Sequence, residues 1–263
     1  MDPVEVSKLD ELLARAENLM DRVEDTYLIT KDILLGTQIS DWIEDLKTSG
    51  TESATYSDAD RMNTLIANND AVNNVNITQY LCDWAVANNK VGTYFGALLG
   101  NVSGVTWNSL STAAQVCGNV TAFTGIANNN TAISVSLSNS VMRQAMYNAY
   151  TTTESILVAS SVAMNVVRSL ATVKDLNDNA ATIGGSGSPY KMFMLEASCG
   201  TVINKYDART VTATLASGSQ ISESLYTSRM NERETWTVNK FVSKITIDEG
   251  SSGVPQIIYL SMD

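Results

Sequence analysis

Acidic side chains in the last third of the chain are its best candidates for catalytic chemistry. Two carboxyl groups about 5 to 9.5 Å apart across a cleft can cleave a glycosidic bond, one as an acid and the other as a base or nucleophile. The acids of this part of the chain include Glu196, Asp207, Glu223, Glu232, Glu234 and Asp248. No two of them stand in a recognisable motif, so we interpret them as solvated surface charges.

Nucleophile pairs, metal ligands and phosphate loops have little support. The chain contains no histidine, which removes the usual base of Ser-His and Cys-His pairs and a common metal ligand. Cys82, Cys117 and Cys199 are widely spaced and predict buried, reduced thiols rather than disulfides or a zinc site. The Gly-Gly-Ser-Gly run at 184–187 lacks the lysine of a phosphate loop and precedes Pro189. We expect no catalytic, cofactor-binding or metal-binding residue and no enzymatic activity.

Charge is unevenly distributed along the 263 residues. The 17 Lys and Arg against 28 Asp and Glu leave a net charge of -11, which would repel a nucleic-acid backbone, so we expect no nucleic-acid partner. Residues 1–60 have a net charge of -10, residues 61–175 have +1 with only nine charged side chains, and residues 176–263 have -2. A single compact domain normally spreads charges over its whole surface, so this distribution predicts three different segments.

Export and membrane signals are not predicted. The N-terminus lacks the basic and apolar regions of a secretory signal, and no uncharged apolar run approaches the roughly 20 residues that cross a bilayer. We expect a chain that is made and folded in a cytoplasm without membrane insertion.

Apolar residues of the first segment follow heptad spacings of 3, 4, 3, 4, 3 and 4. They are Val6, Leu9, Leu13, Ala16, Met20, Val23 and Tyr27. With Pro3 in its first turn and Gly36 as a stop, this pattern predicts one coiled-coil-like helix over about 3–35. A second short helix, ending at Ser49-Gly50, has an apolar side made of Ile39, Trp42, Ile43 and Leu46. Residues 1–60 are thus predicted to be an attachment and oligomerisation segment that self-associates, packs on a partner or folds as a helical hairpin.

Residues 61–181 form a low-charge segment with a degenerate repeat of about ten residues. Pairs of apolar or small residues four positions apart recur in steps of ten or eleven, as in Leu81 and Ala85 or Met142 and Met146. Ten residues over three helical turns mean about 3.33 residues per turn, and frequent Asn, Thr, Ser and Gly favour breaks. We predict an elongated helical region with breaks, against the alternative of short helices folded back as a bundle.

Four asparagines of this segment are candidate seam amides, because each lies seven residues after the start of a repeat. They are Asn88, Asn119, Asn129 and Asn139. Polar residues in a helical seam lower stability but specify register and the number of chains. These amides are expected either to face one another in an oligomer or to lie exposed on the surface.

The last segment changes to a β pattern after a Gly/Ser-rich linker at residues 182–189. Candidate strands are 191–197, 202–206, 210–215, 234–239, 241–247 and 256–261, and apolar and polar residues alternate in 210–215 and 241–247 as in half-buried strands. Residues 190–263 suffice for a small antiparallel β-sandwich, which makes the whole an α+β protein. The aromatic residues Tyr206, Tyr226, Trp236 and Tyr259 are candidates either for stacking on a sugar ligand or for the core of this domain.

In its repeat style the chain resembles bacteriophage virion proteins, chiefly tail-fibre and related fibre or decoration proteins. The resemblance covers roughly residues 61–263 and rests on stretches such as Ala-Asn-Asn-Asn-Thr-Ala-Ile-Ser-Val at 127–135, followed by a compact β domain. It implies a structural virion component, assembled in the host cytoplasm as a homotrimer, whose N-terminal segment docks to other virion proteins. Tail-fibre, head-fibre, collar and decoration positions all stay open.

Two other functions fit the same pattern. A receptor- or glycan-binding module at the tip of a phage adhesin would contact a host surface glycan or protein through the β-rich end and serve host attachment. A bacterial surface stalk would need a signal sequence and a membrane anchor, which we do not expect here. Glycan or cell binding by residues 189–263 would distinguish the adhesin from a purely structural protein.

Overall fold

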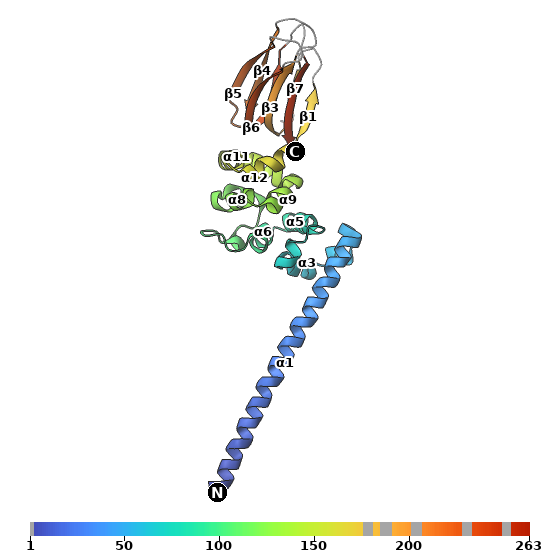
Figure 1. Ribbon diagram of the computed structural model, residues 1–263, viewed down its shortest axis with the longest axis vertical. Coiled ribbons are helices and arrows are strands. Elements are labelled where there is room, and N and C mark those ends of the chain that lie inside the picture. The colour runs from blue at the N-terminus through green and yellow to red at the C-terminus, as the bar shows by residue number, and fades with distance from the viewer. Residues whose placement is uncertain (1–2, 176–180, 185–190, 201–206, 228–232, 249–253) are drawn as a thin grey trace. The chain divides into compact units, whose positions relative to one another are not determined.

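The computed structural model of this chain describes residues 3–175, 181–184, 191–200, 207–227, 233–248 and 254–263. The chain divides into two compact units, Met1–Arg61 and Met62–Asp263. The first unit is helical, and the second begins with helices and ends in an antiparallel sheet (Figure 1). The predicted α+β class is confirmed.

The first unit is dominated by one long helix. α1 (Pro3–Ser49) has 47 residues, which correspond to about 70 Å at 1.5 Å per residue. It continues through Gly36, so the predicted stop and the separate second helix are wrong. A lone glycine costs a helix only about 1 kcal/mol relative to alanine, which the helix-forming residues on both sides offset. α1 ends at Ser49 as predicted, and Gly50 there adopts a left-handed backbone with φ of 56°.

The chain folds back at the C-terminal end of α1. The return is formed by η1 (Gly50–Glu52) and α2 (Ala54–Ser57). Asp45 Oδ2 accepts the backbone N–H of Thr55 at 2.9 Å. The Arg61 guanidinium carbon lies 5.8 Å from the centroid of the Trp42 ring, within range of a cation–π interaction. These contacts tie the return to the last turns of α1.

A series of short helices separated by turns follows α2. They are α3 (Ala59–Ile66), α4 (Asn69–Val72), α5 (Thr78–Ala87), α6 (Val91–Leu99), η2 (Trp107–Ser109), α7 (Ala113–Gly118), α8 (Val120–Ala127), α9 (Asn130–Ser138), α10 (Ser140–Asn148), α11 (Tyr150–Ala159) and α12 (Ser161–Leu170). From α8 to α12 the helices begin at residues 120, 130, 140, 150 and 161, so each ten-residue repeat is one short helix and its turn. The predicted elongated region is therefore wrong, and the chain forms the alternative, short helices folded back on one another.

From α7 to α12 the helices are arranged in a spiral with three helices per turn. Each contacts the next one, and α7 also contacts α10, α8 contacts α11, and α9 contacts α12. Figure 1 shows α11 and α12 in a layer beside α8 and α9. The third residue of three successive helices is buried, namely Ala122, Ala132 and Met142. Positions that repeat every ten residues thus build one continuous core.

The sheet contains seven described strands, and all of their pairings are antiparallel. They are β1 (Thr172–Asp175), β2 (Ala181–Ile183), β3 (Met192–Gly200), β4 (Asp207–Leu215), β5 (Gln220–Thr227), β6 (Arg233–Ile247) and β7 (Val254–Ser261). Their order is β1-β7-β3-β6-β4-β5, and β2 pairs with β6. The predicted strands at 191–197, 210–215 and 256–261 match β3, β4 and β7. Those predicted at 234–239 and 241–247 form one strand, β6.

Sequence reasoning missed β1, β2 and β5. β1 and β2 lie inside the predicted helical segment 61–181 and the predicted linker 182–189, so both segment boundaries need correction. Neither strand has a readable pattern, since β2 has three residues and all four residues of β1 are exposed. β5 is a terminal strand of the sheet and is rich in polar residues. The strand predicted at 202–206 lies outside the described residues.

The sheet curls around an apolar core. β3 and β5 approach each other without being neighbours in the sheet, and the β3 register shifts between Met194 and Glu196. Such a bulge bends a strand and increases its twist. Met194, Val211, Ile245 and Ile257 are fully buried in the resulting core. The described strands belong to one sheet, so the predicted two-sheet sandwich is not confirmed.

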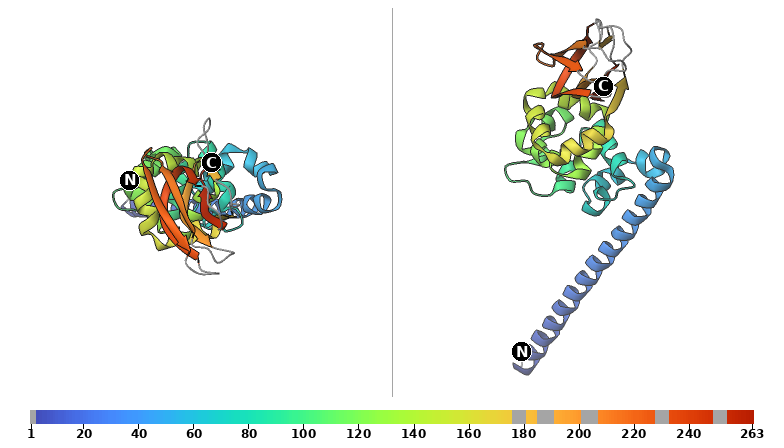
Figure 2. Two further views of the ribbon diagram at one scale, coloured as in Figure 1. Left: turned by 90° about the horizontal axis from the view of Figure 1, so that it is seen from above. Right: turned by 45° about the horizontal axis from the view of Figure 1, so that its top comes forward.

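The last helices pack against the sheet (Figure 2), with α11 touching β6 and α12 touching β7. Glu154 on α11 accepts hydrogen bonds from Lys240 Nζ at 2.7 Å and from the Phe241 backbone N–H at 3.0 Å. Arg143 Nη2 on α10 donates to the backbone oxygen of Asp263 at 2.8 Å. Helices and sheet of the second unit are therefore joined by polar contacts as well as by their core.

Candidate assembly interface

One side of α1 presents exposed apolar side chains along its length, which we call the apolar stripe. Its described members are Leu12, Leu13, Ala16, Leu19, Met20, Val23, Tyr27, Ile33 and Leu34. Its eight large members are 59% to 73% exposed. Val6 and Leu9 continue the spacing toward the start of the helix, but their side chains lie outside the described ones. A contiguous apolar surface of this length marks an interaction site.

The apolar stripe has three rows, whereas the predicted heptad seam had two. One predicted row includes Leu13, Met20 and Tyr27, and the other includes Ala16 and Val23. The third row, which the sequence analysis missed, consists of Leu12, Leu19 and Ile33, each one position before the first row. The spacing of seven between Leu12 and Leu19 was the signal that could have shown it. A stripe of three apolar positions per heptad is wider than the seam of a two-stranded coiled coil.

The centre of the apolar stripe is shallowly hollowed. The hollow has a volume of about 420 Å³ and is lined by Leu19, Met20, Val23, Glu24 and Tyr27. Helices in coiled coils insert side chains into holes formed by four residues of the facing helix. The hollow therefore suits an apolar side chain of a second helix.

Toward its middle, α1 becomes apolar on other sides as well. Leu28, Ile29 and Leu35 lie outside the apolar stripe and are 48%, 59% and 42% exposed. Thr30, Lys31 and Asp32 of this part are polar, but an apolar surface wider than one stripe is normally covered by protein. Residues 27–35 are therefore the part of α1 best suited to contact more than one neighbour.

The candidate seam amides cap helices within the chain instead of facing a second chain. Oδ1 of Asn119, Asn129 and Asn139 each accepts the backbone N–H three residues later at 2.9 Å, which caps α8, α9 and α10. Asn88 lies exposed at the C-terminal end of α5, where its Nδ2 donates to the Trp84 carbonyl at 2.9 Å. This corrects the seam hypothesis, because a spiral of short helices has no continuous seam. Asparagine recurring just before each short helix was the signal for caps.

Asn129→Ala is expected to lower the free energy of unfolding by about 1 kcal/mol, because the Ala132 N–H loses its acceptor. Asn129→Ser should retain most of the stability, since serine also caps helices. Asn128→Ala, one residue earlier and exposed, is the matched control. Urea denaturation followed by circular dichroism measures all three. Equal losses at 128 and 129 would contradict the assigned cap.

The candidate ligand-facing aromatic residues are only partly described, and those that are belong to the core. Tyr259 is 7% exposed within the sheet core, which corrects its assignment as ligand-facing. Trp236 is half-buried and packs against the same core. Tyr206 and the side chain of Tyr226 lie outside the described residues. On a curled sheet, alternate residues of each strand point into the core, and this places Tyr259 inside.

Cys82, Cys117 and Cys199 are buried, reduced thiols, as predicted. Burial raises the pKa of the Cys82 and Cys117 thiols, which keeps both protonated and unreactive near neutral pH. Cys82 and Cys117 are therefore core residues of α5 and α7 and not candidates for catalysis.

None of the described candidate acids lies opposite another acid in the strand register. The strand register places Glu196 opposite Thr237 and Ile258, Glu223 opposite Val211, and Glu234 opposite Cys199. Asp248 Oδ1 accepts the Thr210 N–H at 2.7 Å. Glu232 and the side chain of Asp207 lie outside the described residues. Within the described ranges, no three Cys, Asp or Glu side chains come together as a metal ion would require.

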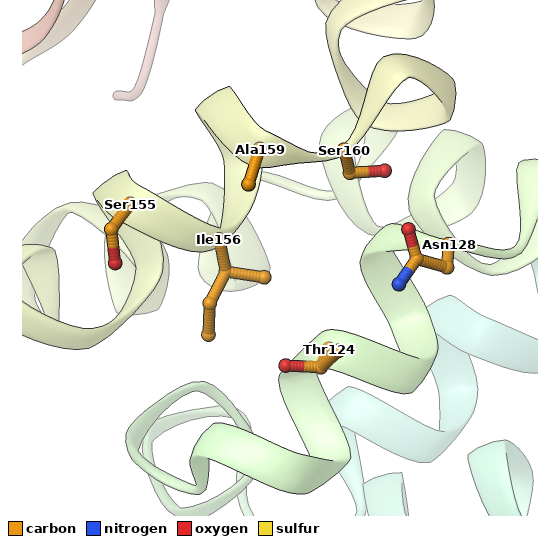
Figure 3. Close-up of a pocket in the computed structure, with 6 residues that line it drawn as sticks. All are labelled: Thr124, Asn128, Ser155, Ile156, Ala159 and Ser160. Atoms are coloured by element: carbon orange, nitrogen blue, oxygen red, sulfur yellow. The ribbon is translucent and has the colours of Figure 1, made fainter.

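A groove of about 390 Å³ lies between α8 and α11, on neighbouring turns of the spiral (Figure 3). It is lined by Thr124, Asn128, Ser155, Ile156, Ala159 and Ser160. Two of its hydroxyls already donate to backbone carbonyls at 2.7 Å, Thr124 to Val120 and Ser160 to Ala127. None of these lining residues ionises, so they offer no acid or base for catalysis.

No protein-family model matches this chain, and a search of curated protein sequences found no significant match. None of the described helices combines the length and the apolar character that crossing a bilayer requires. The apolar stripe is thus interpreted from its own geometry.

Proposed function

We propose that this chain is a structural, non-enzymatic protein of a bacteriophage virion that assembles with copies of itself through α1. The observation that supports it is the apolar stripe, whose large side chains are more than half exposed along a helix of 47 residues. Most of the stability of helices in proteins comes from packing of an amphipathic face rather than from helix propensity. A second copy of α1 has the same apolar stripe, and it is present wherever the first copy is made.

The apolar stripe is large enough to support stable association. Fully burying a large aliphatic side chain contributes about 1.5 to 3 kcal/mol, so a side chain about three-fifths exposed contributes roughly 1 kcal/mol. Eight such side chains contribute roughly 8 kcal/mol per chain, and each added copy contributes its own stripe. A micromolar dissociation constant corresponds to a binding free energy of about 8 kcal/mol, which remains after the entropic cost of association has been subtracted. The apolar stripes of two or more copies together supply enough free energy to offset that cost and reach this value.

The assignment to a virion rests on the resemblance to phage fibre and decoration proteins. The ten-residue repeats rich in Ala, Asn, Ser and Thr, followed by a compact sheet, are the features in common. Residues 27–35, apolar on more sides than the rest of α1, are proposed to contact other virion proteins, and a homotrimer is proposed from the resemblance. Tail fibre, head fibre, collar and decoration protein are the positions that fit.

A receptor- or glycan-binding role of the sheet has less support. Of its four candidate aromatic residues, Tyr259 is buried in the core and Trp236 packs half-buried against it, which leaves less ring surface for a sugar. The structural role is therefore the one we propose.

Self-assembly is tested by light scattering after size exclusion on the full chain and two matched double variants. Ala16→Asp with Met20→Asp places two acids in the apolar stripe and is expected to reduce the particle to a monomer, because each carboxylate would lose its water. Ala14→Asp with Asn18→Asp, also four residues apart, places two acids on other sides of α1 and should leave the mass unchanged. A monomeric unmodified chain, or equal effects of both variants, would contradict the proposal.

A further inference from the structure

We propose that copies of α1 associate parallel and in register as a closed ring of three or more helices, with the acidic edge of each helix against the basic edge of the next. This rests on the proposed self-assembly through α1. It specifies the orientation of the copies and the charged contacts between them.

The two edges flank the apolar stripe and carry opposite charge. Lys8, Arg15 and Arg22, which we call the basic edge, recur every seven residues beside the row of Leu12 and Leu19. Asp10, Glu17 and Glu24, which we call the acidic edge, recur every seven residues beside the row of Leu13 and Met20. On an α-helix, positions seven apart lie on one side, so each edge forms a straight line of like charge.

The described charged side chains of both edges reach solvent. Arg15 is 75% exposed and meets Glu11 of the same helix at 3.3 Å, a type of exposed pair that contributes little to stability. Arg22, Glu17 and Glu24 are also exposed. These side chains are therefore accessible to a neighbouring helix.

The three rows of the apolar stripe require more than one neighbour. Pairing of two parallel helices covers the two seam rows and leaves Leu12, Leu19 and Ile33 largely in water. In a ring, each helix has a neighbour on both sides, so the third row packs against the next helix. The acidic edge, on the opposite flank of the stripe, then lies beside the basic edge of the other neighbour.

The charges also select the direction of the helices. In an antiparallel pair the equivalent flanks of two copies meet, so acidic edge would face acidic edge and basic edge would face basic edge. In a parallel ring each contact joins different flanks of the two helices, which brings opposite charges together. Like charges in such contacts oppose association, whereas opposite charges favour it and set register.

The test exchanges the charges of the two edges. Glu17→Arg with Glu24→Arg makes both edges basic, and Arg15→Glu with Arg22→Glu makes both acidic; each is expected to raise the dissociation constant at least 10-fold. The fourfold variant combines all four changes, keeps the net charge at -11 and should restore the oligomer of the unmodified chain. Because it also lacks the Arg15 to Glu11 pair, restoration would show that the loss arises between chains and not within one helix. Sedimentation velocity gives the dissociation constant and mass, and circular dichroism checks helix content.

Orientation is tested independently with Leu13→Cys. Under air oxidation catalysed by copper phenanthroline, two thiols at position 13 lose two electrons and two protons to oxygen and join as a disulfide only if the helices are parallel and in register. The buried native cysteines do not compete. An oligomer that stays uncrosslinked, a dimeric mass, or a fourfold variant that fails to assemble would overturn this inference while self-assembly stands. A monomeric unmodified chain would overturn both.

Discussion

Gly92→Ala is expected to lower the free energy of unfolding of the protein by about 3 kcal/mol or more. A Cβ atom at this position would lie 1.9 Å from the Trp107 carbonyl oxygen and 2.6 Å from the Leu110 carbonyl oxygen. Both neighbours are backbone atoms, so the turn that contains η2 would have to move away from α6. A Cβ atom at Gly96, one helical turn later, would lie 3.0 Å from the Trp107 side chain, so the turn packs closely against two glycines of α6.

Gly125→Ala is the matched control for Gly92→Ala. Gly125 also lies inside a short helix, but its nearest neighbour would be a Val102 methyl at 3.6 Å, an ordinary contact. Alanine there should stabilise the protein by about 0.5 to 1 kcal/mol, because it is the better helix former. Urea denaturation followed by circular dichroism at 222 nm measures both variants. Similar changes in the two midpoints would contradict the close approach of η2 to Gly92.

Phe241→Ala is expected to lower the free energy of unfolding by about 3 to 5 kcal/mol. Phe241 is fully buried, and its ring lies edge-on to Phe193 at 5.0 Å and to Tyr147 of α10 at 5.7 Å between centroids. Its backbone N–H donates to Glu154 of α11. Truncation would open a cavity at the contact between the helices and the sheet, which neither part can fill alone.

The cooperativity of the Phe241→Ala variant is as informative as its stability. If the junction couples helices and sheet, near-ultraviolet signals of the aromatic residues and the helical signal at 222 nm should separate in the variant but coincide in the unmodified protein. Two controls accompany Phe241→Ala. Phe241→Leu keeps most of the side-chain volume and should lower the free energy of unfolding by less than about 1.5 kcal/mol.

Val173→Ala, at a residue 55% exposed on β1, should change the free energy of unfolding by less than about 0.5 kcal/mol. A loss at Val173 as large as at Phe241 would contradict the assigned core.

Local signals in the sequence were sufficient for the helical and strand character of most segments. The heptad spacing from Val6 to Tyr27 predicted a helix at the start of α1, and the β pattern of the last segment predicted β3, β4, β6 and β7. Each signal depends on residues within about ten positions. By contrast, β1 could not be predicted, since its exposed residues have no pattern and its pairing with β7 joins residues more than 80 positions apart.

The apolar stripe was found only in part from the sequence. Heptad counting identified two rows, while the row of Leu12, Leu19 and Ile33 appeared once exposure along one continuous helix was known. The helix itself was predicted to stop at Gly36, because a glycine can end a helix as readily as it can be accommodated in one. Whether a helix ends at a glycine or continues through it depends on how well the helical turns on both sides are stabilised.

By itself, the sequence determined the ten-residue period, the amphipathic start of α1, the β-rich end and the lack of histidine chemistry. Only the tertiary structure decided that each period is one capped helix and not a section of a rod. The reason is physical. A cap such as Asn129 ends one helix and begins another, but the direction of the next helix depends on buried residues that contact a helix three repeats away. Because of those contacts between distant parts of the chain, the candidate seam asparagines are helix caps and the candidate ligand-facing Tyr259 is a core residue.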